Sequence, residues 1–206
     1  MENAKAHWEQ IYGTRSPSEV SWYQSDPRSS LRLIEDTDIG REDPLIDVGG
    51  GASTLVDHLL EAGYARLAVL DISAAALARA RKRLGDRAGR VEWLEADITE
   101  FVAPHPFRLW HDRAVFHFLT DPADQRRYVR NLDAALVPGG HLIVATFAVG
   151  GPEKCSGLPI VQYDAERLCA VLGPKFALED TFTEVHHTPG GTDQDFAFFR
   201  LRKAPA

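Results

Sequence analysis

The sequence predicts an α/β fold, in which a mainly parallel sheet carries helices on both faces and ends in an antiparallel hairpin. Strand-like apolar runs alternate with helical patterns as far as residue 147, and this alternation is typical of parallel sheets. Two strand patterns then follow around a Gly-Gly turn. No repeat or linker divides the 206 residues, so we predict one domain over 1–206, with an N-terminal helix and lid in 1–40 and the core in 41–206.

The parallel part of the sheet is predicted from five apolar runs. The intervening helices have recognisable ends: Gly63 closes the helix "STLVDHLLEAG", Ser73 caps the alanine-rich helix that runs to Leu84, and Pro122 lies in the first turn of a third helix. A short helix, "DAERLCAVLG", precedes the hairpin. The strands are expected at 44–48, 66–71, 91–97, 107–112 and 141–147.

The predicted hairpin joins "FALEDTFTEVHH" to "QDFAFFRLRK" through "TPGGTD". In a strand that is covered on one face, alternate side chains are buried. We therefore expect one member of each of the pairs His186–His187 and Phe198–Phe199 to pack on the core.

Composition excludes several classes of function. The formal charge of −7 and the pI near 5.6 disfavour a protein that grips nucleic acid by its backbone. The basic cluster from Ala78 to Arg87 is interpreted as a solvated helix face. No run approaches the roughly 18 apolar residues of a membrane span, and the polar N-terminus is not typical of a secretory signal.

The two cysteines, Cys155 and Cys169, are too few for a disulfide framework, and no metal-ligand spacing is present, so we expect no metal. A reducing cytoplasm fits this usage. Cys169 is expected in the core. Cys155 lies in a loop after the fifth strand, where it would either touch a soft substrate or be incidental.

The stretch "LIDVGGGAS", from Leu45 to Ser53, raises the functional question. Glycine-rich turns after a strand usually cradle phosphate, and Gly49 and Gly51 match the first two positions of a dinucleotide fingerprint, but Thr54 stands at the third. Asp47 would repel a pyrophosphate and attract a cationic ligand. S-adenosylmethionine has no phosphate, an α-ammonium group and a positive sulfonium.

Two further acids support this ligand. Asp71 ends the second strand about 20 residues beyond the glycines, where a carboxylate can accept from both ribose hydroxyls. Asp97 ends the third strand, where it can accept from the exocyclic amine of adenine. Each acid alone would serve equally well as a helix N-cap, but three in register favour a ligand crevice.

The motifs "LIDVGGGAS", "VLDIS", "LEADI", "FRLWHDRAVFHFL" and "LVPGGHLIVATF" together resemble class I S-adenosylmethionine-dependent methyltransferases over residues 45–147. The resemblance implies a Rossmann-like, seven-stranded sheet and a methyltransferase. Arg108 stands where the family often has an acid, and we expect it to face solvent. The stretch from Leu109 into "YVRNL" is similar to thiopurine S-methyltransferase-like enzymes, which methylate sulfur, selenium or tellurium.

The resemblance implies which residues bind S-adenosylmethionine. The methionine end would meet Asp47, the glycines and the backbone near His111 and Asp112, while the ribose would meet Asp71 and the adenine Asp97. Trp22 and Tyr23 would either close over the cofactor, with an aromatic face on the sulfonium, or pack on the core. The predicted cofactor-binding residues are Trp22, Asp47, Gly49, Gly50, Gly51, Asp71, Ile72, Asp97, Ile98 and His111.

The predicted catalytic residues are Asp112, Arg113 and His117. Arg113 would hold an anionic nucleophile or form an ion pair with a carboxylate such as Asp112. His117 would orient or deprotonate the substrate, or be a hydrogen-bonded histidine under the lid. Because a thiol needs no strong base, the leading acceptor is a small thiol or other chalcogen nucleophile.

Two alternative functions stay open. The N-terminal "HWEQIYG…SEVSWYQ" also resembles small lysine-directed methyltransferases, so a protein lysine methyltransferase is the first alternative. An NAD(P)-binding oxidoreductase or a nucleotide sensor is the alternative from another class. The expected partner is a small-molecule methyl acceptor, without nucleic acid or membrane, and the chain is expected to be a monomer or homodimer.

Overall fold

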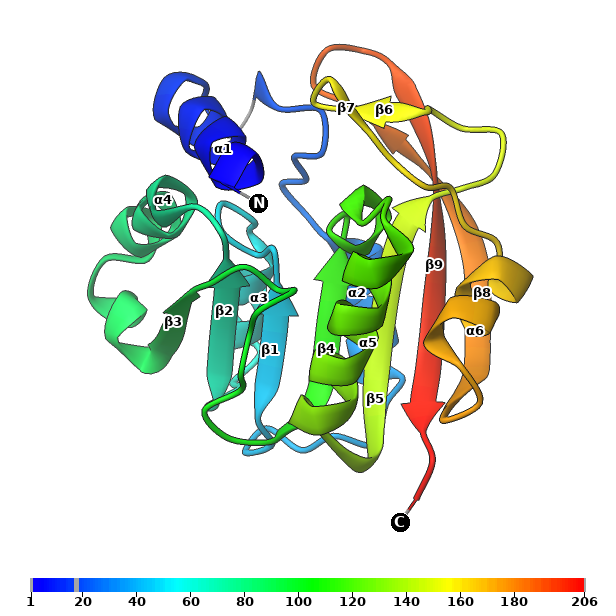
Figure 1. Ribbon diagram of the computed structural model, residues 1–206. Coiled ribbons are helices and arrows are strands. Elements are labelled where there is room, and N and C mark those ends of the chain that lie inside the picture. The colour runs from blue at the N-terminus through cyan, green and yellow to red at the C-terminus, as the bar shows by residue number, and fades with distance from the viewer. Residues whose placement is uncertain (1, 17–18, 206) are drawn as a thin grey trace.

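The computed structural model describes residues 2–16 and 19–205. A seven-stranded sheet forms its centre, in the order β3-β2-β1-β4-β5-β9-β8. Strands β1 to β5 are parallel, and β9 runs antiparallel between β5 and β8 (Figure 1). The predicted fold class, including the seven-stranded sheet and the C-terminal hairpin, is confirmed.

The strands lie close to their predicted positions. Ala96 and Asp97 follow β3 rather than belong to it, and β5 begins earlier than expected. The strands are β1 (Leu45–Val48), β2 (Leu67–Asp71), β3 (Val91–Glu95), β4 (Phe107–Arg113), β5 (Leu136–Phe147), β6 (Lys154–Cys155), β7 (Leu158–Pro159), β8 (Phe176–His187) and β9 (Asp193–Lys203).

The helices have the predicted ends: Ser73 caps α4 by accepting from Ala76 N, Pro122 begins α5, and Gly63 follows α3 with a φ of +87°. The N-terminal region contains two helices instead of the single one expected. The helices are α1 (Glu2–Thr14), α2 (Arg28–Glu35), α3 (Leu55–Glu61), α4 (Ala74–Leu84), α5 (Pro122–Ala135) and α6 (Ala165–Leu172).

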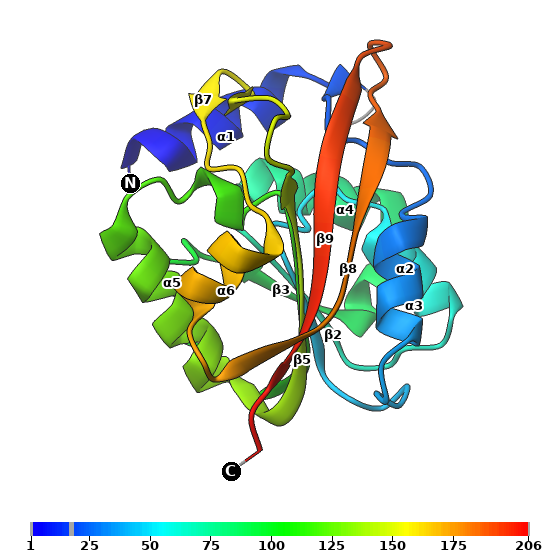
Figure 2. The same cartoon turned by 90° about the vertical axis from the view of Figure 1, so that its right-hand side faces the viewer.

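Each face of the sheet has its own core. Ile46 of β1 and Trp110 of β4 pack towards α5 and α6, whereas their neighbours Leu45 and Leu109 pack towards α2 and α3. Alternate residues of one strand thus belong to opposite layers. Figure 2 shows α2 and α3 on one side of the sheet and α5 and α6 on the other.

The hairpin corrects one prediction. His186 is buried and His187 exposed, as expected, but Phe198 and Phe199 are both buried. They belong to the two opposite cores, because β9 is an inner strand covered on both faces. The alternation argument assumed a strand with one covered face.

Arg108 also differs from the prediction that it faces solvent. Its guanidinium donates to Gly139 O at 2.9 Å and to Asp38 Oδ1 at 3.1 Å, and His141 and Arg202 contact the same carboxylate. Arg108 therefore belongs to a charge cluster at the end of β4 opposite its carboxyl end.

Candidate active site

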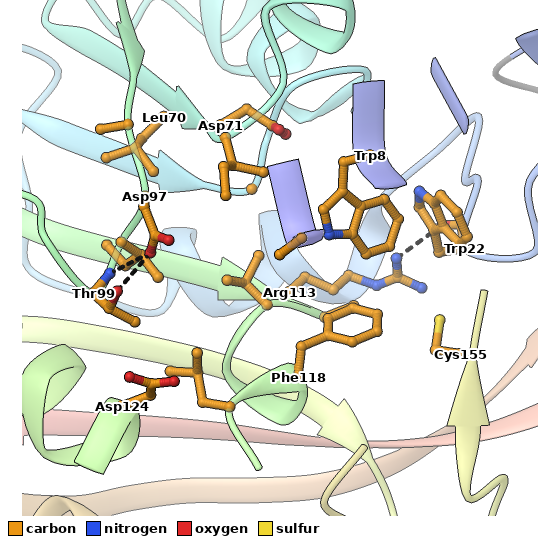
Figure 3. Close-up of a pocket in the computed structure, with 18 of the residues that line it drawn as sticks. Trp8, Trp22, Leu70, Asp71, Asp97, Thr99, Arg113, Phe118, Asp124 and Cys155 are labelled. Carbon is orange, nitrogen blue, oxygen red and sulfur yellow. Dashed lines mark hydrogen bonds between the residues drawn. The ribbon is translucent and has the colours of Figure 1, made fainter. Parts of the chain in front are cut away.

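A cavity of about 230 Å³ lies at the carboxyl ends of the parallel strands (Figure 3). This is the edge at which open α/β sheets bind ligands. A smaller cavity of about 50 Å³ shares Gly49 with the first and is also lined by Ser30, Asp47 and His111. Arg113 lines both cavities.

The glycine turn is tightly packed against side chains. A Cβ at Gly49 would overlap Val115, one at Gly50 would overlap Asp47, and one at Gly51 would overlap Asp71. Gly49 also has a φ of +71°, a conformation that L side chains rarely adopt. Packing against these side chains is therefore enough to explain three successive glycines, and no phosphate ligand is needed to account for them.

Asp47 belongs to a buried hydrogen-bonded chain. Because Asp47 and His111 are register partners on β1 and β4, their side chains emerge on the same face of the sheet. His111 Nδ1 lies 2.7 Å from Asp47 Oδ1, and His111 Nε2 lies 2.9 Å from Ser30 Oγ. The other oxygen, Asp47 Oδ2, is buried without a hydrogen-bond partner in the described part of the chain, so it can accept from a ligand.

Asp71 lines the larger cavity at the end of β2. Its Oδ1 accepts from Ser73 N at 2.9 Å and its Oδ2 from Gly51 N at 3.0 Å. Burial raises the pKa of this carboxyl to about 7, although both hydrogen bonds favour the ionised form. Each oxygen keeps a second lone pair for a ligand hydroxyl.

Asp97 faces the same cavity from the segment after β3, beside Ile72 and Ile98. Its Oδ1 accepts from Thr99 N at 2.9 Å and from Thr99 Oγ1 at 2.8 Å. A polar acceptor between two apolar side chains suits a flat base that carries an amino group.

The N-terminal segment covers the cavity with aromatic rings. Trp8 packs against Trp22 at 5.5 Å and Phe118 at 5.1 Å between ring centroids, and Trp22 Nε1 donates to the Tyr12 hydroxyl at 3.1 Å. Trp22 lines both cavities and Tyr23 only the smaller one. Both predicted aromatic residues of the lid thus border a cavity, whereas Met1, Pro17 and Ser18 of the N-terminal segment lie outside the described residues.

Arg113 is the charged group at the meeting point of the two cavities. Its Nη1 donates to Trp22 O at 2.9 Å, and the guanidinium lies 4.4 Å from the ring centre of Phe196. Burial lowers its pKa to about 10, which leaves it charged at neutral pH. Arg113 makes no ion pair within the described residues, so the predicted alternative of a pair with Asp112 is wrong.

The structure does not bring Asp112 to either cavity. Asp112 points towards α5, where its Oδ2 accepts from the Tyr128 hydroxyl at 2.7 Å. Its Oδ1 accepts from the backbone N–H groups of Val115 and Phe116. Asp112 therefore shapes the turn that follows β4.

His117 is fully buried and lies outside the two cavity linings. Phe147 N donates to its Nδ1 at 3.4 Å, and its ring packs on Phe118 and Phe147. Burial and the charge of Arg113 lower its pKa to about 3. This environment matches the predicted alternative of a histidine packed under the lid.

Cys155 reaches the larger cavity from a short hairpin that the sequence did not reveal. Strands β6 and β7 pair around Ser156 and Gly157, both with positive φ, as type I′ turns require. His7 lies 3.1 Å from Ser156 Oγ and thereby joins α1 to this hairpin. Burial raises the pKa of the Cys155 thiol to about 12.

Several lining residues were not singled out by the sequence, among them Trp8, Tyr12, Ser30 and Phe118. Trp8 and Tyr12 stand in the quoted "HWEQIYG", and their spacing of four residues along a helix was the available signal. Ser30 had no such signal because α2 itself was not predicted. Phe118 stands in the quoted "FRLWHDRAVFHFL", directly after the catalytic candidate His117.

Three comparisons with known proteins bear on this site. The model of a methyltransferase domain matches residues 46–142, slightly less than half of the chain. Nodulation protein S of Sinorhizobium fredii is 33% identical over 99 residues, which are 48% of this chain and 44% of that protein. The eEF1A lysine and N-terminal methyltransferase of Bos taurus is 25% identical over 91% of this chain and 25% of its own length. The chain thus spans at most about half of the curated relatives it matches.

Solved structures share the whole fold. The N-methyltransferase NodS of Bradyrhizobium japonicum, in complex with S-adenosyl-L-homocysteine, has a TM-score of 0.70 at 21% identity, covering 95% of this chain and 97% of that chain. A structure described as converting a disulfide bond into a thioacetal group during echinomycin biosynthesis has a TM-score of 0.79 at 18% identity, covering 98% and 93%. At these identities the likeness confirms the fold alone.

Proposed function

We propose that this chain is an S-adenosylmethionine-dependent methyltransferase that acts on a small nucleophile, with a thiol or other chalcogen centre as the leading acceptor. The observation that carries the proposal is the set of three acids, Asp47, Asp71 and Asp97, around a glycine turn without room for side chains. The match of residues 46–142 to a methyltransferase domain supports the class of reaction.

The cavity residues fit the cofactor part by part. Asp71 would accept from the ribose hydroxyls, and Asp97, flanked by Ile72 and Ile98, would hold the adenine. The buried, unpartnered Oδ2 of Asp47 would attract the ammonium of the methionine part. NodS, whose structure holds S-adenosyl-L-homocysteine, supports this choice of cofactor.

The acceptor would enter on the side of the cavity formed by Arg113, Phe118 and Cys155 (Figure 3). The cofactor supplies an activated methyl group, and the bond from carbon to its sulfonium sulfur breaks as the bond to the acceptor sulfur forms. The chain's part is to orient the acceptor and exclude water, which the aromatic cover of Trp8 and Trp22 would do. A thiol loses its proton to solvent beforehand, so no protein base is required.

The remaining catalytic candidates have supporting roles in this proposal. Asp112 fixes the turn that carries Arg113 and Val115 into place. His117 supports Phe118 from below. The similarity to thiopurine S-methyltransferase-like enzymes, the cytoplasmic location and the monomeric or dimeric state stay predictions. No helix within residues 2–16 and 19–205 is long and apolar enough to cross a bilayer.

Nitrogen is the second candidate acceptor. The solved NodS is an N-methyltransferase, and the bovine relative is named for lysine and N-terminal methylation. A methyl-transfer screen with labelled cofactor decides between these acceptors, with small thiols, selenols, amines and phenols set beside a cell lysate. We expect label on small thiols; label only in a protein band would refute the small-molecule acceptor.

Calorimetry tests the class of function separately. S-adenosylhomocysteine should bind with micromolar affinity and NAD should not bind, whereas binding of NAD alone would favour an oxidoreductase. Asp71→Ala should weaken S-adenosylhomocysteine binding by about 1–3 kcal/mol, because the ribose hydroxyls lose a charged acceptor. Asp47→Asn should weaken it as well. Unchanged affinity in both folded variants would contradict the site.

A further inference from the structure

Arg113 is a half-buried cation, and the hydrogen-bonding capacity of its guanidinium is mostly unused. Its Nε and Nη2 atoms are buried and have no hydrogen-bond partner among the described residues. Only Nη1 is engaged, with Trp22 O. Because an unpaired buried charge is costly to a fold, a guanidinium kept in this state between two cavities points to a ligand that completes it.

The surroundings of the guanidinium favour an anion of small size. Phe196 covers it 4.4 Å from the ring centre. Trp22, Phe118 and Cys155 line the larger cavity with it. Glu184 acts on Arg113 from a distance, but its own carboxylate is bound by Ser29 and Gln24. The guanidinium fork matches the two oxygens of a carboxylate.

We propose that Arg113 binds a carboxylate carried by the methyl acceptor, so that the preferred acceptor is a small acidic thiol. This inference rests on the proposed function and adds the charge of the substrate to it. The carboxylate takes no part in the methyl transfer itself. It holds the acceptor so that its sulfur faces the cofactor side of the cavity, near the glycine turn.

The same charge discriminates against other acceptors. An amine enters mainly as an ammonium ion, which Arg113 repels in a site of low dielectric constant. A neutral thiol of the same size gains nothing from Arg113. The cofactor's own carboxylate is the competing ligand, because Arg113 also lines the smaller cavity beside Asp47.

The test compares three thiols of similar size: mercaptopropionate, mercaptoethanol and cysteamine. For each, kcat/KM is measured as S-adenosylhomocysteine formed by the full chain, and the affinity for S-adenosylhomocysteine is measured by calorimetry. We expect wild type to prefer the acid over the neutral thiol by about tenfold or more, and the amine to be poorest. Arg113→Met should abolish this order with little change in cofactor affinity, and Arg113→Lys should keep part of it.

The matched control is Arg108→Met, which removes a half-buried arginine at the opposite end of β4 and should leave the order unchanged. A preference of wild type for cysteamine would overturn the proposal. So would an Arg113→Met variant that loses cofactor affinity and keeps the order, because the guanidinium would then bind the cofactor.

A second readout does not depend on turnover. Propionate is titrated into the protein saturated with S-adenosylhomocysteine and is followed by NMR. Binding to wild type, weaker binding to Arg113→Lys and no binding to Arg113→Met support the subsite even if no thiol is methylated, in which case only the choice of thiol fails. Absence of propionate binding to wild type contradicts the subsite. If S-adenosylhomocysteine itself does not bind, the proposed function fails and this inference fails with it.

Discussion

His111 Nδ1 lies 2.7 Å from Oδ1 of Asp47, and this contact joins β4 to β1 directly beneath the glycine turn. Because a carboxylate only accepts, the ring donates from Nδ1, and the Ser30 hydroxyl of α2 completes the chain at Nε2. Since Oδ1 of Asp47 is held by His111, its other oxygen, Oδ2, points away from His111 and can accept a hydrogen bond from a ligand. Because Ser30 belongs to α2, this helix helps to orient the carboxylate of Asp47.

Ser30→Ala should weaken the binding of S-adenosylhomocysteine by about 1 kcal/mol, or about fivefold, because His111 loses one of its two anchors. Calorimetry measures the affinity. Ser29→Ala is the matched control, since its hydroxyl bonds to Glu184 instead. Equal affinities in wild type and both variants would show that Asp47 needs no support from α2.

Gly49→Ala should destabilise the fold by about 1–3 kcal/mol, because Gly49 combines a positive φ with close contact to Val115. Chemical denaturation measures the change. Gly63→Ala is the control for the backbone alone: Gly63 has a φ of +87°, and a Cβ there would meet no atom within 4 Å. Adding Val115→Ala to Gly49→Ala should recover part of the loss. If Gly49→Ala costs no more than Gly63→Ala, the contact with Val115 is unimportant.

The parallel sheet and the glycine turn were predictable because their signals are local. Asp47, Asp71 and Asp97 each lie at or near the carboxyl end of a predicted strand, and the edge of a parallel sheet brings these ends close together. The starts of α4 at Ser73 and of α5 at Pro122 were predictable for the same reason, because a helix start is determined by residues close together in the sequence.

The rest depends on contacts between distant segments. Asp112 was predicted at the site because it lies near the carboxyl end of the fourth strand, but strand alternation turns it towards Tyr128 of α5. Ser30 reaches His111 across 81 positions of sequence, and nothing near Ser30 indicates it. The free state of Arg113 is likewise a property of the packed structure, since the sequence equally allowed an ion pair.

The buried carboxyl of Asp71 predicts a pH dependence of cofactor binding. Its pKa in the folded chain, about 7, lies above the ordinary 3.8. The protonated form is therefore favoured by folding, and this contribution to stability is full below about pH 4 and lost as the pH rises through about 7.

The affinity for S-adenosylhomocysteine should change in the opposite direction. Because ribose hydroxyls donate to the ionised carboxylate of Asp71, this affinity should rise from about pH 6 to about pH 8 by up to tenfold. Calorimetry across this range measures it, and Asp71→Ala should flatten the profile. A profile as steep in that variant would assign the effect to another group.

Tyr128→Phe tests whether Asp112 is a positioning residue. The variant removes the hydroxyl that donates to Asp112 Oδ2 at 2.7 Å and also leaves Trp110 Nε1 without its acceptor. Burial raises the pKa of Asp112 to about 6, and the Tyr128 hydrogen bond holds it down. The lost bond therefore matters most where Asp112 is ionised, above about pH 6, and least where it is protonated. We expect a loss of about 1–3 kcal/mol in the free energy of unfolding at about pH 8 and a smaller loss at about pH 5.

Methyl transfer per folded molecule should change little, because neither Asp112 nor Tyr128 lines either of the two cavities. A large fall in kcat without a loss of stability would instead place Asp112 in the reaction.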